Sequence, residues 1–272
     1  MRHTMLLILT LTAGCSKPEP APAPPATPSG PRIETREFTY TQGTTPLKGF
    51  IAWDANTTSK RPGVLVVHEW WGHNEHARNQ ARRLAEAGYV GLALDMYGDG
   101  KVTTHPDSAQ AFMMAAVKDP KTMTARFLAA LDQLKRDPHV DSARVAAIGY
   151  CFGGGVVLSM ARSDLGLAAV ATFHGALGGL APIGPGGVKP RILVMTGEAD
   201  PMVPAKEVER FRTEMTAAKA RFQIISYPGV KHSFTNPNAD KVGMDGLSYN
   251  ADADRQSWAE LRKMLGEVFP TA

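Results

Sequence analysis

The apolar residues of the chain fall into two alternating patterns. Short continuous apolar runs, typical of strands buried on both faces of a sheet, alternate with stretches in which apolar residues recur at helical spacing. The first pattern predicts strands over 61–67, 89–94, 144–148, 166–173 and 191–196, with a last one over 222–227. The second predicts helices over 74–87, 108–117, 123–135, 204–218 and 252–268. Two earlier strands, 33–40 and 47–53, are expected to pair antiparallel through Gln42 and Gly43.

The order of these elements predicts the fold class. A strand, a helix and a strand within about thirty residues form a right-handed βαβ unit, as in residues 61–94. The continued alternation predicts an α/β fold with a mostly parallel, twisted sheet and helices on both faces. No internal repeat and no second shift in composition occurs within 32–272, so we expect one domain there.

The first residues differ from the rest of the chain. A positively charged start, an apolar run over 5–12 and the small residues Ala13-Gly14-Cys15 predict a secretory signal peptide over 1–14, too short for a permanent membrane span. The Gly-Cys ending resembles the lipobox of bacterial lipoproteins, whose Cys is acylated and becomes the mature N-terminus. Such signals usually carry Leu three positions before the Cys, where this chain has Thr12.

Proline occurs at nearly every second position after Cys15, and residues 15–31 are expected to form a linker. This composition favours an extended polyproline II spacer, as a tethered domain needs. We therefore expect an exported protein, lipid-anchored at Cys15 to a bacterial membrane and facing the periplasm. A soluble periplasmic or secreted form is the alternative.

The net charge of +4 is spread along the chain without a basic block, which gives no indication of nucleic-acid binding. No metal and no cofactor is expected, and we expect a monomer. The ordinary globular composition supplies enough apolar residues for a full core.

The stretch Gly149-Tyr-Cys-Phe-Gly153 lies between a predicted strand and an apolar helical stretch. Strand, Gly-x-Cys-x-Gly and helix is the arrangement of a nucleophile elbow, with sulfur in place of oxygen. Small residues two positions either side let strand and helix pass closely, while the helix N-terminus favours a thiolate. A buried structural cysteine is the alternative. If Cys15 carries lipid, Cys151 has no disulfide partner, because the chain has only these two cysteines.

Four chemically active side chains follow predicted strands: Glu69, Cys151, Asp200 and His232. Ligands of doubly wound sheets bind beyond the carboxyl ends of the strands, so we expect these side chains to converge. Cys, Asp and His occur in the order nucleophile, acid and base that the elbow architecture requires. His232 is expected to act as general base and then general acid, and Asp200 to hold the imidazole in the useful tautomer.

Several segments resemble the dienelactone hydrolase family of the α/β-hydrolase superfamily. They span about Arg36 to the C-terminus in consistent order, namely His68-Glu-Trp-Trp-Gly72, Ala81-Arg-Arg-Leu-Ala-Glu-Ala-Gly-Tyr89, Ala93-Leu-Asp-Met-Tyr-Gly98, Gly149-Tyr-Cys-Phe-Gly-Gly154, Gly197-Glu-Ala-Asp200 and Lys231-His-Ser-Phe234. The resemblance implies an α/β-hydrolase fold, cleavage of a carboxylic ester or lactone, and a Cys151-His232-Asp200 triad that forms an acyl-cysteine intermediate. It also implies that Glu69 holds the resting thiol and takes its proton when substrate enters.

One position departs from the family's pattern. The enzymes that give the family its name hold their substrate's carboxylate partly through an Arg four residues beyond the triad His, where this chain has Asn236. We therefore expect a neutral or apolar ester, in a pocket near Trp70, Trp71 and Phe234. The backbone N–H groups of Phe152 and Trp70 are expected to bind the oxyanion.

Some residues allow a second interpretation. Asp95 also ends a predicted strand, but it precedes the nucleophile, so a role in a turn is expected. The cluster His68, Glu69, His73, Glu75 and His76 invites a zinc interpretation, yet it lacks two His at i, i+4 on one helix. His174 follows a strand and either lines the pocket or packs in the core.

Two classes of function remain open from the sequence alone. The favoured class is a small-molecule hydrolase, and a thioesterase or acyltransferase would use the same groups. The other class is a non-catalytic lipoprotein that uses the fold to bind a ligand or partner.

Overall fold

The computed structural model describes residues 30–270, and the folded unit begins at Pro31. The predicted signal peptide, Cys15 and nearly all of the proline-rich linker therefore lie outside the described residues. Within 30–270, no helix has the length and apolarity needed to cross a membrane.

One sheet with the order β1-β2-β4-β3-β5-β6-β7-β8 forms the centre of the domain. Its strands are β1 (Ile33–Gln42), β2 (Thr45–Asp54), β3 (Arg61–Val67), β4 (Val90–Leu94), β5 (Val140–Tyr150), β6 (Ala169–Phe173), β7 (Arg191–Gly197) and β8 (Phe222–Tyr227). β1 pairs antiparallel with β2, and β2 with β4, whereas all pairs from β4 to β8 are parallel. The predicted mostly parallel sheet with an antiparallel leading pair is confirmed.

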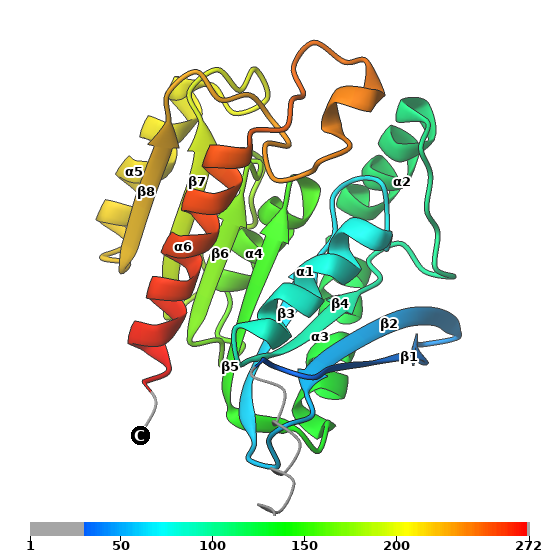
Figure 1. Ribbon diagram of the computed structural model, residues 1–272. Helices are drawn as coiled ribbons and strands as arrows, with labels where there is room; N and C mark the ends of the chain where they lie inside the picture. Colours follow the sequence, from blue (N-terminus) through cyan, green and yellow to red (C-terminus); the bar gives the residue numbers. More distant parts are fainter. Residues whose placement is uncertain (1–29, 271–272) are drawn as a thin grey trace, which may run out of the picture. The chain divides into compact units, whose positions relative to one another are not determined.

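Six α-helices pack on the two faces of this sheet (Figure 1). They are α1 (Glu75–Glu86), α2 (Pro106–Lys118), α3 (Pro120–Arg136), α4 (Phe152–Ala161), α5 (Ala205–Ala217) and α6 (Ala251–Val268). All predicted helices are present within a few residues of their expected ends. The short 3-10 helix η1 (Ala239–Val242) was not predicted.

The apolar runs place side chains on both faces of the sheet, because successive residues of a strand point in opposite directions. In β3, Leu65 and Val67 belong to the core under α3, α4 and α5, whereas Val64 and Val66 belong to the core under α1 and α6. Fully buried strands explain why these runs are continuous in the sequence and do not alternate with polar residues.

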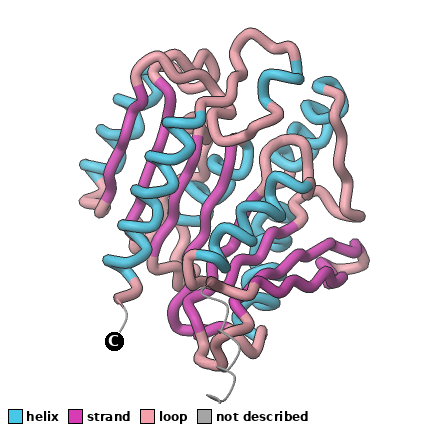
Figure 2. Tube along the Cα trace, in the orientation of Figure 1, coloured by secondary structure: helices cyan, strands magenta, loops and turns pink. Residues whose placement is uncertain are grey.

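The carboxyl ends of the parallel strands lie at one edge of the sheet, where loops gather (Figure 2). The connections after β3, β5, β7 and β8 all leave from this edge. The fold therefore brings together the segments that carry Glu69, Cys151, Asp200 and His232.

Candidate active site

Cys151 lies between β5 and α4 in a strained backbone conformation, with φ 52° and ψ −116°. It is the N-cap of α4, and its own N–H donates to the carbonyl of Phe173 at 3.0 Å. Close backbone contacts explain why glycines lie two positions before and after Cys151. A Cβ on Gly149 would collide with the carbonyl of Gly153, and one on Gly153 would collide with the carbonyl of Val67. The geometry is that of a nucleophile elbow, with the thiol partly exposed at the edge of the sheet.

His232 and Asp200 form a buried hydrogen-bonded pair. The imidazole Nδ1–H donates to Asp200 Oδ2 at 2.8 Å. The other carboxylate oxygen of Asp200 accepts from the backbone N–H groups of Met202 and Val203 at 2.8 and 3.2 Å, which orients the carboxylate. The backbone of His232 is held between Gly246 and Ser248.

Nδ1 of the His232 ring binds Asp200, whereas Nε2 is buried and has no hydrogen-bond partner of good geometry within residues 30–270. Burial lowers the pKa of His232, but the charge of Cys151 and its hydrogen bond, together with the hydrogen bond and charge of Asp200, raise it to about 10. The protonated form of His232 is therefore favoured at neutral pH.

Glu69 follows β3 and is buried, with 1% of its surface exposed. Its Oε1 accepts from the hydroxyl of Ser233 at 3.1 Å, and its Oε2 accepts from the amide of Asn236 at 2.6 Å. His76 Nδ1 lies 3.8 Å from Oε2. The hydrogen bonds of the Glu69 carboxylate therefore go to the loop that carries His232, and no hydrogen bond from the Cys151 thiol to this carboxylate occurs in the described part of the chain. This differs from the resting contact that the family resemblance implied.

The two predicted oxyanion donors, Phe152 and Trp70, lie just beyond the carboxyl ends of β5 and β3. Phe152 is the first residue of α4, so its N–H has no acceptor one turn earlier in the helix. Trp70 lies in the β3–α1 connection, and its N–H has no backbone acceptor within residues 30–270. The carbonyl of Trp70 accepts from the hydroxyl of Tyr97 at 3.1 Å, which fixes this peptide from the far side.

The expectation that Phe234 lines the pocket is wrong. Its side chain is fully buried and packs against the rings of Tyr227 and His174. Phe234 follows His232 by two residues, and the left-handed backbone of Ser233 turns its side chain into the core. Its ring therefore supports the catalytic loop and has no surface for a substrate.

Trp71 is largely buried but contributes to a cavity of about 380 Å³. Its neighbours come from three connections that follow β3, β4 and β8, namely Asn74, Glu75, His76, Thr103, Thr104, Asn236, Asn238, Lys241 and Val242. Asn236 and Asn238, from the loop that follows His232, line this cavity.

A second cavity of about 380 Å³ begins at Phe152, the residue after Cys151. Its lining is mainly apolar, with Met113, Val117, Met123, Val156, Leu180 and Pro182 among the contributing residues. The cavity lies against α4 and extends toward α2 and the β6–β7 connection. Side chains of this kind favour an apolar part of a substrate.

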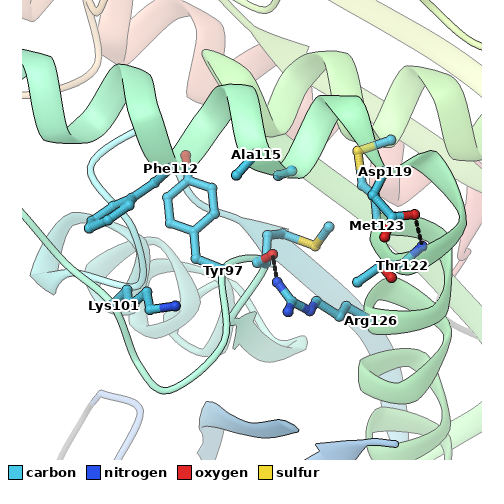
Figure 3. Close-up of a pocket in the computed structure, with 10 residues that line it drawn as sticks. Tyr97, Lys101, Phe112, Ala115, Asp119, Thr122, Met123 and Arg126 are labelled. Atoms are coloured by element: carbon cyan, nitrogen blue, oxygen red, sulfur yellow. Dashed lines mark hydrogen bonds between the residues drawn. The ribbon is translucent and has the colours of Figure 1, made fainter.

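A third cavity, of about 240 Å³, lies between α2, α3 and the β4–α2 connection and contains none of the predicted site residues (Figure 3). Tyr97 and Phe112 line one side, and Arg126 donates to the carbonyl of Met96 at 2.8 Å. Tyr97 connects this cavity to the elbow, because its ring lies 5.5 Å from that of Phe152 and its hydroxyl donates to the Trp70 carbonyl.

Asp95, which also follows a strand, has the role in a turn that its place in the sequence predicts. Asp95 accepts hydrogen bonds from the backbone N–H groups of Lys48, Tyr97, Gly98 and Gly100, as expected of a turn residue.

The three histidines of the proposed zinc cluster bind different partners. His68 Nε2 accepts from the N–H of Met96, His73 Nε2 lies 3.1 Å from the carbonyl of Ala93, and His76 contacts the loop after His232. In the described residues, no group of three or more His, Cys, Asp or Glu side chains is arranged to hold a metal ion.

The sequence left His174 open between lining the pocket and packing in the core, and it did not predict that His76 would contact the loop of His232. His174 is fully buried, and its ring lies 5.0 Å from that of His232 at an angle of 63°. His76 contacts both Glu69 and the backbone of Thr235. Besides its place in the histidine cluster, His76 has one sequence signal, its position on the first turn of α1 four residues before the buried Gln80.

The fold and the elbow define an α/β hydrolase. Residues 47–269 match the dienelactone hydrolase family, and the chain belongs to that family. It is 30% identical over 218 residues to the "Putative carboxymethylenebutenolidase" of Escherichia coli strain K12, covering 74% of each chain.

Two solved structures are similar over nearly their whole length. The dienelactone hydrolase-like promiscuous phosphotriesterase P91 from metagenomic libraries is 37% identical with a TM-score of 0.81, covering 87% of this chain and 98% of that chain. The structure named m3DLH is 39% identical with a TM-score of 0.83, covering 87% and 99%. Membership of this family confirms the prediction of a hydrolase of the ester or lactone type.

Proposed function

We propose that this enzyme cleaves a neutral carboxylic ester or lactone through an acyl-cysteine intermediate, with Cys151 as nucleophile, His232 as general acid and base, and Asp200 as its orienting carboxylate. The observation that carries the proposal is the buried hydrogen bond of 2.8 Å between His232 and Asp200, together with a cysteine in the geometry of a nucleophile elbow. The strained N-cap of α4 presents the sulfur at the sheet edge.

The chemistry follows from these positions. The Cys151 thiolate attacks the carbonyl carbon, and the N–H groups of Phe152 and Trp70 hold the oxyanion of the tetrahedral intermediate. The C–O bond to the leaving alcohol then breaks, and the His232 imidazolium donates its proton to the departing oxygen. A water molecule next attacks the acyl-cysteine while His232 takes the water's proton. Collapse of the second intermediate releases the carboxylic acid and restores the thiolate.

Glu69 acts in this proposal by holding the loop of His232 and not as the resting base of the thiol. Both carboxylate oxygens accept from that loop, at Ser233 and Asn236. The imidazole of His232, held by Asp200, takes the thiol proton in this proposal. The role of proton acceptor that the family resemblance implied for Glu69 is therefore unnecessary here.

The substrate preference follows from Asn236 and from the apolar cavity. Asn236 donates to Glu69 and carries no charge for a substrate carboxylate. The buried Glu69 beside it repels a second anion. The cavity that begins at Phe152 offers apolar side chains to an acyl group.

The test is turnover of p-nitrophenyl acetate by residues 31–272, compared with a Cys151→Ala variant. We expect the variant to lose at least about 1,000-fold in kcat, because covalent catalysis requires the sulfur. Trapping of the acyl group on Cys151, seen by mass spectrometry after rapid quenching, is expected in the parent protein only. Equal rates for the two proteins would leave only a binding role for the site.

We also propose that the protein is lipid-anchored at Cys15 and exported. The support is the apolar run, the Gly-Cys sequence and the proline-rich segment. In a bacterial host, palmitate label should enter the full chain and disappear in Cys15→Ala. Absence of label from the parent chain would show a cleaved soluble form.

A further inference from the structure

Two histidines that the proposed chemistry does not use, the buried His174 and the partly buried His76, contact one residue of the catalytic loop. That residue is Thr235, three positions after His232, with 1% of its surface exposed. His174 Nε2 lies 2.9 Å from the Thr235 hydroxyl, and His76 Nε2 lies 3.3 Å from the Thr235 carbonyl oxygen. The two histidines come from the end of β6 and the start of α1, far apart in the chain.

The loop needs external support because its backbone is strained. Ser233, next to His232, has φ 56°, a conformation that favours glycine. Such conformations persist where surrounding contacts determine them. His232 itself has a single side-chain hydrogen bond of good geometry in the described residues, to Asp200, which fixes one edge of the ring. The position of the opposite edge, which faces the sulfur, depends on the loop.

His174 is suited to this support because it stays neutral. Burial, followed by the charges of His232 and His76, lowers its pKa well below the ordinary value. A neutral ring can pack with its edge against the His232 ring without repelling the imidazolium. Its Nδ1 has no hydrogen-bond partner in the described residues, so the bond to Thr235 is the polar contact that orients this ring.

His76 reaches the same residue from the other side. A carbonyl oxygen only accepts, so the contact with Thr235 requires a proton on Nε2 of His76. The amide nitrogen of Gln80 lies 3.3 Å from the same Nε2 and competes for it when that nitrogen carries no proton. The His76 ring packs edge-on against Tyr150, at 5.1 Å and 87°, which holds it between Glu69 and Thr235.

We propose that His76 and His174 are positioning residues that hold Thr235 from two sides and thereby keep the His232 ring in line with the Cys151 sulfur and the leaving group. The inference rests on the proposed triad. Neither histidine is placed in contact with the substrate, so their effect is expected on the steps in which His232 transfers a proton.

The first test uses Thr235→Val, which removes the hydroxyl with little change of volume and keeps the carbonyl. The matched control is Thr196→Val, because Thr196 is also buried and its hydroxyl has no partner in the described residues. Both variants are measured on phenyl butyrate and p-nitrophenyl butyrate, with active sites titrated. The phenolate leaving group needs a proton from His232 more than the nitrophenolate does.

We expect Thr235→Val to lower kcat/KM about 10- to 100-fold on phenyl butyrate and less than about threefold on p-nitrophenyl butyrate, because misplacing a proton donor by a fraction of an ångström costs rate only where the proton is needed. Thr196→Val should match the parent on both esters. Equal losses on the two esters, or none, would overturn the proposal, whereas a parent enzyme inert on both would contradict the proposed function itself.

The second test needs no turnover. The Nδ1 proton of His232 is followed by NMR, and its exchange with solvent should quicken at least about tenfold in Thr235→Val and stay unchanged in Thr196→Val, since a looser loop opens the Asp200 bond more often.

His76→Gln keeps an amide near the Nε2 position, whereas His76→Asn does not. We expect Gln to retain more activity than Asn on phenyl butyrate, and the reverse order would remove His76 from the proposal.

Discussion

The side-chain amide of Asn236 donates to Glu69 Oε2 at 2.6 Å and so connects the loop of His232 to the end of β3. Asn236 stands where the family's name-giving enzymes carry an Arg. A neutral donor at this place satisfies the buried carboxylate without supplying a positive charge for a substrate. The contact therefore bears on both the geometry of the catalytic loop and the charge that the site accepts.

Glu69→Gln is expected to lower kcat/KM about 10- to 100-fold while the fold stays intact. The new amide presents an NH₂ group to one of two donors, Ser233 or Asn236, and a lost hydrogen bond to a charged group is worth about 1.5–3 kcal/mol. Steady-state kinetics and circular dichroism measure the two effects. Glu75→Gln, at an exposed glutamate on α1, is the control, and unchanged kinetics in Glu69→Gln would remove Glu69 from the site.

The elbow glycines should differ in their tolerance of a methyl group. Gly153→Ala is expected to destabilise the domain by about 1–3 kcal/mol or more, because its Cβ would collide with the carbonyl of Val67. Gly155→Ala should cost little, since its Cβ would lie 3.5 Å from the carbonyl of Ala176. Urea unfolding of the two variants and the parent measures the difference. Equal stability of the two variants would contradict this account of the elbow.

The pKa of His232 predicts the alkaline limit of activity. The pKa is raised to about 10, so the imidazolium that donates to the leaving group persists at neutral pH and is lost as pH rises through about 10. Activity on esters with poor leaving groups should fall there. In Cys151→Ala the effect of Cys151, which raises the pKa of His232, disappears, while burial still lowers that pKa. NMR titration should then find His232 titrating at lower pH than in the parent, and an unchanged value would contradict the thiolate–imidazolium pair.

A matched pair of substrates tests the preference for neutral compounds. We expect a dienelactone with a free carboxylate to react about tenfold or more slowly, by kcat/KM, than its methyl ester, because Glu69 lies behind Asn236 and the site offers the carboxylate no arginine. Asn236→Arg should reduce the difference in kcat/KM between the anionic dienelactone and its methyl ester. A parent enzyme that prefers the anion would show that another cation, such as Lys241 of the cavity that Trp71 lines, binds the carboxylate.

Much of the fold could be predicted from local patterns. Continuous apolar runs such as 61–67 identify doubly buried strands, and the periodicity of 74–87 identifies α1, because both depend on which residues must leave water. Element ends were less accurate. β5 begins at Val140 and not near 144, since pairing of Arg61 and Pro62 with Val140 and Asp141 extends it through polar residues.

The chain by itself determined the α/β class, the family and the positions of the residues that follow strands, since glycine spacing, apolar runs and residue order are local properties. Tertiary structure alone decided the partners of those residues. It turned Phe234 into the core, directed Glu69 to Ser233 and Asn236, and placed His76 and His174 on either side of Thr235. Such contacts join residues up to 167 positions apart, as Glu69 and Asn236 are, and depend on loop paths that no local pattern encodes.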